Sequence, residues 1–325
     1  MSAIFHIIIV MDKLKKFEDK IKEIYIDKAD SIFEQLNSAP AKSFWINTLN
    51  FSEDEVLAEL KSEGFEVEKS RIPFMYIVKD SDLQLAKSNA FINNKIYIQQ
   101  LSSSIPAMLI NPKQNEKILD LTAAPGSKTS LMSVLSKGKA KITAVETNKN
   151  RFFRLKKNLE DYGIKNVDCI LADGKTLVKR FPEFENHFDK VLVDAPCSNE
   201  AALCLTDEAS FKYWNPGKGK SLSGLQKSLL ASGFDMLKPG GSLVYSTCTF
   251  SVEENEMVVD WLLNKYENAK LEQLDLPKGI PADNGKIEWR RKNFQPTLIS
   301  TKRILPNDYF EGFFVSVVSK NKNYK

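Results

Sequence analysis

The chain has 325 residues, a length typical of about two domains. Its net charge of +4, with 42% hydrophobic and 27% charged residues, excludes a disordered chain and predicts a globular protein with a large core. Four cysteines in so long a chain form no disulfide framework, which favours the cytoplasm, and with two histidines we expect neither a metal site nor histidine acid–base chemistry.

The first segment with a clear pattern is N-terminal. Residues 3–11 are apolar, but they are too short to span a bilayer and lack the basic residue and cleavage site of a signal peptide, so we expect no membrane association. Met11 opens a pattern of apolar residues at helical spacing that continues to Leu36. Our hypothesis is that translation begins at Met11 and that residues 1–10 are not translated. A native peptide from Ser2–Val10 in mass spectrometry would contradict it.

A small α+β module is predicted for residues 1–95. The helix that begins at Met11 ends before Asn37-Ser-Ala-Pro40, and a Ser52-x-x-Glu55 capping box begins a second helix that ends at Gly64. Short strands are predicted at 44–49, 65–67 and 74–78. By themselves these residues indicate a small domain and no particular function.

In the second part of the chain, strands and helices alternate as in a doubly wound sheet. Lys117–Leu121 is a short apolar run, Thr122–Gly126 is a turn of small residues, and Ser127 begins a helix. Such a corner presents free backbone N–H groups to a ligand. It matches neither the three-glycine dinucleotide fingerprint nor the Walker loop, because Gly126 is its one glycine and Ser127 separates Gly126 from Lys128.

Four more strands continue the alternation, at 141–146, 167–172, 190–194 and 241–247. Helices are predicted at 127–135, 148–162, 222–237 and 252–265. A final hairpin is predicted from two segments, 298–304 and 312–318. Five parallel strands followed by a hairpin indicate an α/β protein with a mostly parallel sheet.

Acidic and thiol side chains stand at the carboxyl ends of the predicted strands, where ligands bind in open α/β sheets. The carboxylates at these ends are Asp120, Glu146, Asp173 and Asp194. Cys197 follows the fourth strand and Cys248 follows the fifth. A single acid at a strand end is more often a helix cap, but a series of them with two cysteines indicates a site. Cys169 and Cys204 are predicted to be small hydrophobic residues instead.

Several segments carry a family resemblance. They are Tyr97-Ile-Gln-Gln-Leu-Ser-Ser103, Leu119-Asp-Leu-Thr-Ala-Ala-Pro-Gly-Ser-Lys-Thr129, Val193-Asp-Ala-Pro-Cys-Ser198, Leu237-Lys-Pro-Gly-Gly-Ser-Leu-Val-Tyr-Ser-Thr-Cys-Thr249, Glu253-Glu-Asn-Glu256, Arg303-Ile-Leu-Pro306 and Gly312-Phe-Phe314. In this order they resemble the Nop/Sun (RsmB/Nop-like) family of S-adenosylmethionine-dependent RNA cytosine-5 methyltransferases. The resemblance implies a Rossmann-like, seven-stranded methyltransferase sheet with an antiparallel last strand at 96–325, after an RNA-binding module at 1–95.

The resemblance also implies roles for single residues. Cys248 is expected to add to carbon 6 of cytosine, which activates carbon 5 toward the methyl group, and Cys197 is expected to help the product leave. Asp194 is expected to bond the base, and Lys128 to supply positive charge. Glu146 and Asp173 suit the ribose hydroxyls and the adenine amino group of S-adenosylmethionine. The expected cofactor-binding residues are Ala123, Ala124, Pro125, Gly126, Ser127, Lys128, Glu146, Arg151, Asp173 and Asp194.

The implied partner is RNA, with ribosomal RNA ahead of transfer RNA, bound by a monomer without a metal ion. Two alternatives stay open. One is a DNA cytosine-5 methyltransferase in which Cys197 attacks, since the sequence does not rank the two thiols. The other is a non-catalytic ribosome-assembly protein that binds RNA. The chain departs from the family at Asn199-Glu200-Ala201, where Gly-x-Gly is common, which predicts a stiffer loop. It also has Trp45 where arginine is common.

Overall fold

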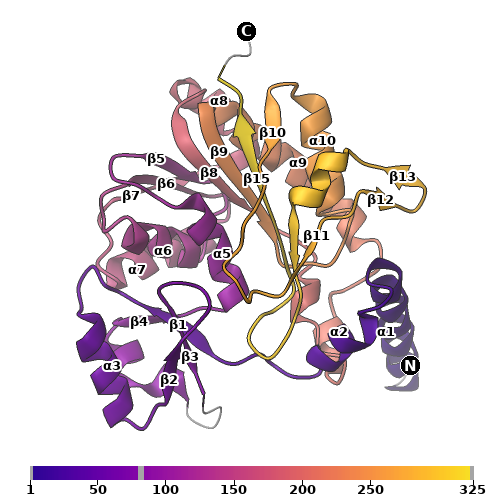
Figure 1. Ribbon diagram of the computed structural model, residues 1–325, viewed down its shortest axis with the longest axis horizontal. Helices are drawn as coiled ribbons and strands as arrows, with labels where there is room; N and C mark the ends of the chain where they lie inside the picture. Colours follow the sequence, from indigo (N-terminus) through magenta and orange to yellow (C-terminus); the bar gives the residue numbers. More distant parts are fainter. Residues whose placement is uncertain (1–2, 80–83, 323–325) are drawn as a thin grey trace.

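The computed structural model describes residues 3–79 and 84–322, which form a large sheet with helices on both faces and a smaller sheet beside it (Figure 1). The large sheet confirms the predicted α/β class. Within the described residues, no helix combines the length and apolar character that crossing a bilayer requires.

The smaller sheet is antiparallel, with the strand order β2-β3-β1-β4. Its strands are β1 (Ser43–Ile46), β2 (Val67–Lys69), β3 (Met75–Val78) and β4 (Ile96–Ile98). The helices α3 (Glu53–Ser62) and α4 (Asn89–Ile92) cover one face over a core that contains Phe44 and Leu60. Ser52 precedes α3 as predicted, but its side chain makes no capping hydrogen bond, so the capping box itself was wrong.

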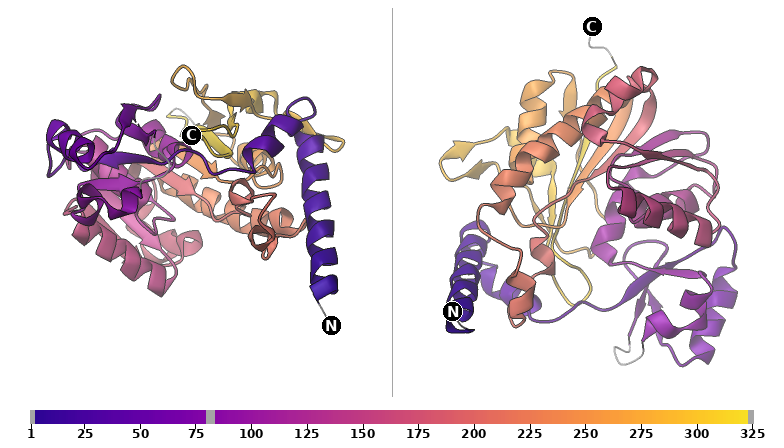
Figure 2. Two further views of the ribbon diagram at one scale, coloured as in Figure 1. Left: turned by 90° about the horizontal axis from the view of Figure 1, so that it is seen from below. Right: turned by 180° about the vertical axis from the view of Figure 1, so that it is seen from behind.

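The N-terminal helices lie away from this small sheet. The predicted helix from Met11 is two helices, α1 (Ala3–Ile24) and α2 (Ala29–Gln35). Phe17 of α1 packs edge-on against Phe211 and Trp214, with ring centroids 5.8 and 5.5 Å apart. Figure 2 shows α1 at the opposite end of the molecule from β1–β4. Residues 1–2 lie outside the described residues, and the start of translation at Met11 stays a prediction.

The segment predicted as one N-terminal module therefore lies in two places. Its helices α1 and α2 pack beside residues of the second part of the chain, and its sheet extends past residue 95 to include β4. The boundary between the two domains stays a prediction.

The large sheet has the strand order β11-β14-β15-β9-β8-β5-β6-β7, with β10 also paired to β15. Its strands are β5 (Lys117–Asp120), β6 (Lys141–Glu146), β7 (Val167–Leu171), β8 (Phe188–Asp194), β9 (Leu237–Thr247), β10 (Ala269–Leu271), β11 (Ala282–Asn284), β14 (Lys302–Ile304) and β15 (Phe313–Lys320). The five predicted parallel strands are parallel, and β15 runs antiparallel to β9 as expected. The predicted seven strands carry two short additions, β10 and β11.

Helices cover both faces of this sheet because its strands are apolar on both sides. Successive residues of a strand point to opposite faces, so Ile118 enters one core and Leu119 the other. The first core is covered by α5 (Leu101–Ile110), α6 (Ser127–Leu135) and α7 (Lys149–Asp161). The second core is covered by α9 (Lys218–Met236) and α10 (Glu256–Lys265), with the short α8 (Leu177–Arg180) at its edge.

Some elements of the second part of the chain were not predicted. Helix α5 was not predicted, since its Ser-rich start and the internal Pro106 are poor helix signals. The predicted hairpin forms from β14 and β15, but Leu298 belongs to a 3₁₀ turn at Pro296–Ser300. A small ribbon of β12 (Glu288–Trp289) and β13 (Lys292–Asn293) projects beside α1.

Candidate active site

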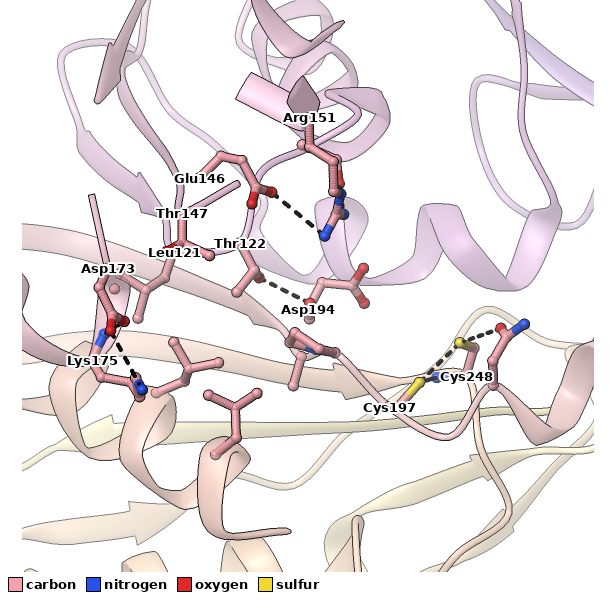
Figure 3. A pocket seen from close by; sticks show the side chains of 17 residues that line it. Leu121, Thr122, Glu146, Thr147, Arg151, Asp173, Lys175, Asp194, Cys197 and Cys248 are labelled. Carbon is pink, nitrogen blue, oxygen red and sulfur yellow. Dashed lines mark hydrogen bonds and ion pairs between the residues drawn. The ribbon is translucent and has the colours of Figure 1, made fainter. Parts of the chain in front are cut away.

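A cavity of about 490 Å³ opens at the carboxyl ends of the parallel strands (Figure 3). It brings together seven of the predicted site residues, which are Ala124, Glu146, Arg151, Asp173, Asp194, Cys197 and Cys248. Figure 3 shows the two cysteines on one side of Asp194 and the carboxylates of Glu146 and Asp173 on the other. The cavity therefore has a thiol end and an acidic end.

The acidic end is built from the tips of β6 and β7. Glu146 is buried, and its carboxylate accepts a hydrogen bond from the Asn148 backbone N–H at 2.8 Å. The guanidinium of Arg151 lies 3.6 Å from the other Glu146 oxygen and donates to the Ala124 carbonyl at 2.5 Å. Arg151 thereby fixes the loop after β5 against the end of β6.

Asp173 stands across the cavity from Glu146. Its carboxylate accepts from the backbone N–H of Lys175 at 3.0 Å, and the Lys175 ammonium lies 3.4 Å away. The carboxylate is half-exposed, so it keeps oxygen lone pairs for a ligand.

The loop between β5 and α6 forms part of the cavity wall through Leu121, Thr122 and Ala124. Ala124 lines the cavity, whereas the predicted residues Ala123, Pro125, Gly126, Ser127 and Lys128 do not belong to its described lining. Gly126 precedes α6 with a φ of +110°, and an added Cβ would lie 3.0 Å from the Leu155 side chain. A glycine is therefore required where the chain turns into the helix.

Asp194 and Lys128 form an ion pair in the middle of the site. The Lys128 ammonium lies 2.7 Å from one Asp194 oxygen, and the Ser246 hydroxyl donates to the other oxygen at 2.7 Å. Burial opposes the charge on Lys128, but the facing carboxylate of Asp194 outweighs it and raises the pKa of Lys128. The ammonium therefore stays charged beside the thiols.

The two cysteines are in contact at the thiol end. Their Sγ atoms are 3.0 Å apart, and the Cys248 Sγ also lies 3.0 Å from the side-chain oxygen of Asn199. The hydrogen bond to Cys248, together with burial, raises the pKa of Cys197 well above its ordinary value. The raised pKa keeps Cys197 protonated, so its thiol can donate to the Cys248 sulfur. The predicted hydrophobic residues Cys169 and Cys204 are partly buried, and neither lines the described cavity.

Comparisons with known proteins identify the family of this chain. Residues 107–319 match the model of a family described as 16S rRNA methyltransferase RsmB/F. The chain is 35% identical over 319 residues to a tRNA (cytosine(49)-C(5))-methyltransferase of Pyrococcus abyssi, which covers 95% of this chain and 98% of that protein. The chain belongs to the RsmB/F methyltransferase family. The Nop/Sun resemblance is thereby confirmed.

Other relatives of this RsmB/F family member differ in length. A ribosomal RNA small subunit methyltransferase F of Cronobacter sakazakii is 32% identical over 86% of this chain and 57% of its own length. The 25S rRNA (cytosine-C5)-methyltransferase nop2 of Schizosaccharomyces pombe is 31% identical over 93% of this chain and 50% of its own length. A solved structure of a methyltransferase homologue from Pyrococcus horikoshii has a TM-score of 0.82 at 27% identity, covering 96% of this chain and 98% of that one. The chain thus spans nearly all of the archaeal relatives and about half of the bacterial and yeast ones.

The departure from the family's Gly-x-Gly pattern has a structural explanation. Asn199 adopts a left-handed conformation with a φ of +58°, which glycine takes freely and asparagine tolerates. Glu200 is fully buried and accepts hydrogen bonds from Lys20 at 2.7 Å and from Trp214 at 3.0 Å. The other Glu200 oxygen accepts from the Thr249 hydroxyl at 2.9 Å. The N-terminal helix α1 therefore supports the segments that follow both cysteines, and the stiffness of the loop stays a prediction.

Glu254, in the segment Glu253-Glu-Asn-Glu256, ties the two cysteine segments together from behind. It is fully buried and accepts from the Ser198 backbone N–H and from the Gln226 amide, each at 2.9 Å. Burial raises the pKa of its carboxyl group. Reasoning from the sequence missed this support because Gln226 lies on α9, far away in the chain. The matched segment was the one signal that pointed to Glu254.

Asp120 ends β5 but serves the fold of this family member rather than its cavity. It is buried, one of its oxygens accepts from the Thr129 hydroxyl at 2.6 Å, and the other has no partner within the described residues. Burial raises the pKa of Asp120 from 3.8 to about 6. The carboxyl group therefore holds its proton in the folded state under conditions in which the unfolded chain has released it.

This pKa predicts a pH dependence of stability. As the pH rises from about 4 to about 6, the unfolded state loses the Asp120 proton before the folded state does. The free energy of unfolding therefore falls by about 3 kcal/mol, because the two pKa values of Asp120 differ by about two units. Asp120→Asn removes this titration. The free energy of unfolding of variant and parent is measured in urea. Between pH 4 and 7, the value of the variant relative to that of the parent should increase by up to this amount. A difference that is constant with pH would contradict the assignment.

Proposed function

We propose that this family member transfers a methyl group from S-adenosylmethionine to carbon 5 of a cytosine in RNA through a covalent adduct with Cys248. The observation that carries the proposal is the pair of thiols 3.0 Å apart beside the ion pair of Lys128 and Asp194. A base-activating carboxylate, a cation and two thiols are the groups that nucleophilic attack on a pyrimidine requires.

The acidic end of the cavity fits S-adenosylmethionine. The whole cavity has a volume of about 490 Å³, which is typical of a small-molecule site. The carboxylates of Glu146 and Asp173 suit ribose hydroxyls and an adenine amino group, and Leu225 and Leu229 supply an apolar wall for a flat ring. Arg151 and the loop residues Thr122 and Ala124, which line the cavity, would hold the remaining polar groups. When bound, S-adenosylmethionine would supply carbon 5 with the methyl group that its positively charged sulfur carries.

The residues of the chain carry the rest of the reaction. The Cys248 thiolate forms a bond to carbon 6, and the electron pair of the C5–C6 double bond moves onto carbon 5 and the ring. Asp194 hydrogen-bonds the base, and Lys128 offsets the charge that develops. Carbon 5 takes the methyl group, which leaves S-adenosylhomocysteine as the by-product. Carbon 5 then loses its proton to a base, and the C–H electron pair re-forms the C5–C6 double bond. The bond between carbon 6 and Cys248 breaks, with its electron pair on the sulfur.

Cys197 suits the last step. Its thiol is held protonated and donates to Cys248, so it stabilises the sulfur as this atom leaves carbon 6 with the bonding electron pair. A buried thiol with a raised pKa is a poor nucleophile, which weighs against the alternative in which Cys197 attacks DNA. The intact set of groups weighs against the alternative of a non-catalytic assembly protein.

The RNA is proposed to be ribosomal, as the sequence analysis favours, and a transfer RNA is the second candidate. The observation that favours the second candidate is the match over 98% of the archaeal tRNA enzyme, since the matches cover only 57% of the bacterial and 50% of the yeast rRNA enzyme. In either RNA the target base must leave its stack to reach Cys248.

Bisulfite sequencing of total RNA from cells with and without the gene tests the proposal. We expect one cytosine to lose protection when the gene is deleted and to regain it when the gene is restored. Its position separates ribosomal from transfer RNA. Unchanged protection at every RNA position would overturn the proposal.

Glu146→Gln tests the cofactor site. The amide keeps the size of the side chain but loses the charge-assisted hydrogen bonds, so we expect affinity for S-adenosylhomocysteine to fall about tenfold to a hundredfold by calorimetry. Glu116→Gln is the matched control, because Glu116 pairs with Lys190 outside the described lining of this cavity. Equal affinities of the two variants would place the cofactor elsewhere.

A further inference from the structure

Ser103 links the catalytic ion pair to the small N-terminal sheet. Its Oγ accepts one hydrogen bond from the Lys128 ammonium at 2.9 Å and a second from the Gln99 amide at 3.3 Å. A serine oxygen has two lone pairs, so both are used. Lys128 is therefore held by the charge of Asp194 and also by a neutral oxygen, which the Gln99 amide fixes in place.

The orientation of Gln99 is fixed by Trp45. An indole N–H can only donate, and the Trp45 Nε1 lies 2.8 Å from the Gln99 Oε1, so the amide nitrogen must face Ser103. Ser43 fixes the backbone of Gln99, since its carbonyl accepts from the Gln99 N–H at 3.0 Å and its hydroxyl donates to the Gln99 carbonyl at 2.6 Å. Gln99 is 6% exposed, so these bonds are shielded from water.

Trp45 itself is rigidly placed. It is fully buried in β1 and stacks on Tyr97 with ring centroids 5.2 Å apart and planes 2° from parallel. Tyr97 in turn packs on Tyr162 at 5.1 Å, and Tyr162 donates to the Ile96 carbonyl. The indole N–H therefore has little freedom to leave Gln99.

We propose that Trp45, Gln99 and Ser103 are positioning residues for Lys128, forming a hydrogen-bonded relay from the small sheet to the methyl-transfer site. The proposal rests on the proposed function in taking Lys128 as part of that site. The relay runs from β1 through the end of β4 and helix α5 to α6, so consecutive hydrogen bonds connect the small sheet to the reacting groups. If RNA binding distorted the small sheet, the position of the Lys128 ammonium would change.

The relay matters because several side chains besides Ser103 face the Lys128 ammonium. The groups that face its ammonium are Asp194, Asp120 and Cys248, together with the Phe313 ring, whose centroid is 6.0 Å away. Without the Ser103 oxygen, the ammonium keeps its charge partners but loses the contact that fixes its direction. Its position between Asp194 and the thiol then becomes variable, and a misplaced catalytic group costs rate more than binding.

Single-turnover methylation of the RNA, with saturating S-adenosylmethionine, tests the relay. We expect Ser103→Ala to lower the rate about tenfold to a hundredfold, as removing a hydrogen bond to a charged group does. Gln99→Met should lower it about tenfold at most, because Gln99 bonds the neutral Ser103 hydroxyl. Affinities for RNA and cofactor should change less than about twofold, as for a contact that acts on rate alone. Ser103→Thr, which restores the hydroxyl, should recover most of the rate, and the double variant Ser103→Ala/Gln99→Met should be no slower than Ser103→Ala.

Ser102→Ala is the matched control. Ser102 lies next to Ser103 on α5, is fully buried, and donates to the Glu311 carbonyl at 2.7 Å, so its loss reports a purely structural effect. Equal rates for Ser102→Ala and Ser103→Ala would overturn the relay, as would multiplied effects in the double variant.

A second readout does not need methylation. Acetic anhydride labels neutral amines, and mass spectrometry measures its rate at Lys128. We expect Ser103→Ala, but not Ser102→Ala, to label Lys128 several-fold faster than the parent, because the ammonium loses an acceptor. Faster labelling in a protein that never methylates RNA would retain the relay and reject the proposed function. Unchanged labelling with active parent protein would reject the relay alone.

Discussion

Cys248→Ala is expected to abolish methylation, lowering the single-turnover rate by about four to six orders of magnitude, the loss typical of a missing nucleophile. Cofactor binding should survive, because Glu146 and Asp173 lie on the other side of Asp194. The measurement is transfer of a labelled methyl group to RNA, with calorimetry for the cofactor. Cys204→Ala is the control, since this cysteine is partly exposed outside the described cavity lining, and it should keep full activity.

Cys197→Ala is expected to behave differently from Cys248→Ala. The first bond to carbon 6 still forms, but release of the product slows by about a hundredfold to ten-thousandfold without the donating thiol. A covalent complex of protein and RNA should then accumulate and survive denaturing electrophoresis. If Cys197→Ala formed no complex and Cys248→Ala did, the roles would be reversed and Cys197 would be the attacking thiol.

The sequence predicted the acidic and thiol ends of the site because parallel strands end at one edge of a sheet. Glu146, Asp173 and Asp194 are far apart in the chain, yet Glu146 and Asp194 end their strands and Asp173 lies two residues after β7, so topology brings them together. The same rule placed Asp120 at the site, but its side chain turns into the core. The end of a strand fixes where a residue lies and not which way its side chain points.

The supporting groups could not be predicted in the same way. Ser103 and Gln226 lie on helices, and their partners Lys128 and Glu254 belong to other elements, so no local pattern links them. The packing of α1 was also missed, since an amphipathic pattern gives the buried face of a helix and not what covers it. Short edge strands such as β10 form because β15 offers them an open edge.

The Arg303–Glu256 ion pair is buried in the core and supports the segment that follows Cys248. Arg303 is 1% exposed and Glu256 is fully buried, and the guanidinium donates to the two carboxylate oxygens at 2.6 and 2.5 Å. It also donates to the Phe250 carbonyl at 2.9 Å and to the Tyr25 hydroxyl at 3.1 Å. Phe250 follows the Cys248 segment and Tyr25 follows α1, so one side chain joins both to β14.

Arg303→Met is therefore expected to lower the free energy of unfolding by about 3–5 kcal/mol, because it leaves the Glu256 charge buried without a partner. Arg290→Met is the control. Arg290 is 55% exposed and pairs with Glu23 at the surface, so its loss should cost less than about 1 kcal/mol. Urea unfolding followed by tryptophan fluorescence measures both.

The double variant Arg303→Met/Glu256→Gln separates charge from packing. It removes the carboxylate that Arg303→Met leaves without a charged partner. The Glu256 carboxylate accepts a hydrogen bond from the Lys286 backbone N–H at 2.9 Å, and the oxygen of the new amide can still accept it. If the loss in Arg303→Met comes from an unpaired buried charge, the double variant should regain a large part of it. If it comes from lost packing or from the contacts to Phe250 and Tyr25, the double variant should be as unstable as Arg303→Met. In that case the guanidinium acts as a clamp between segments, and its charge partner is secondary.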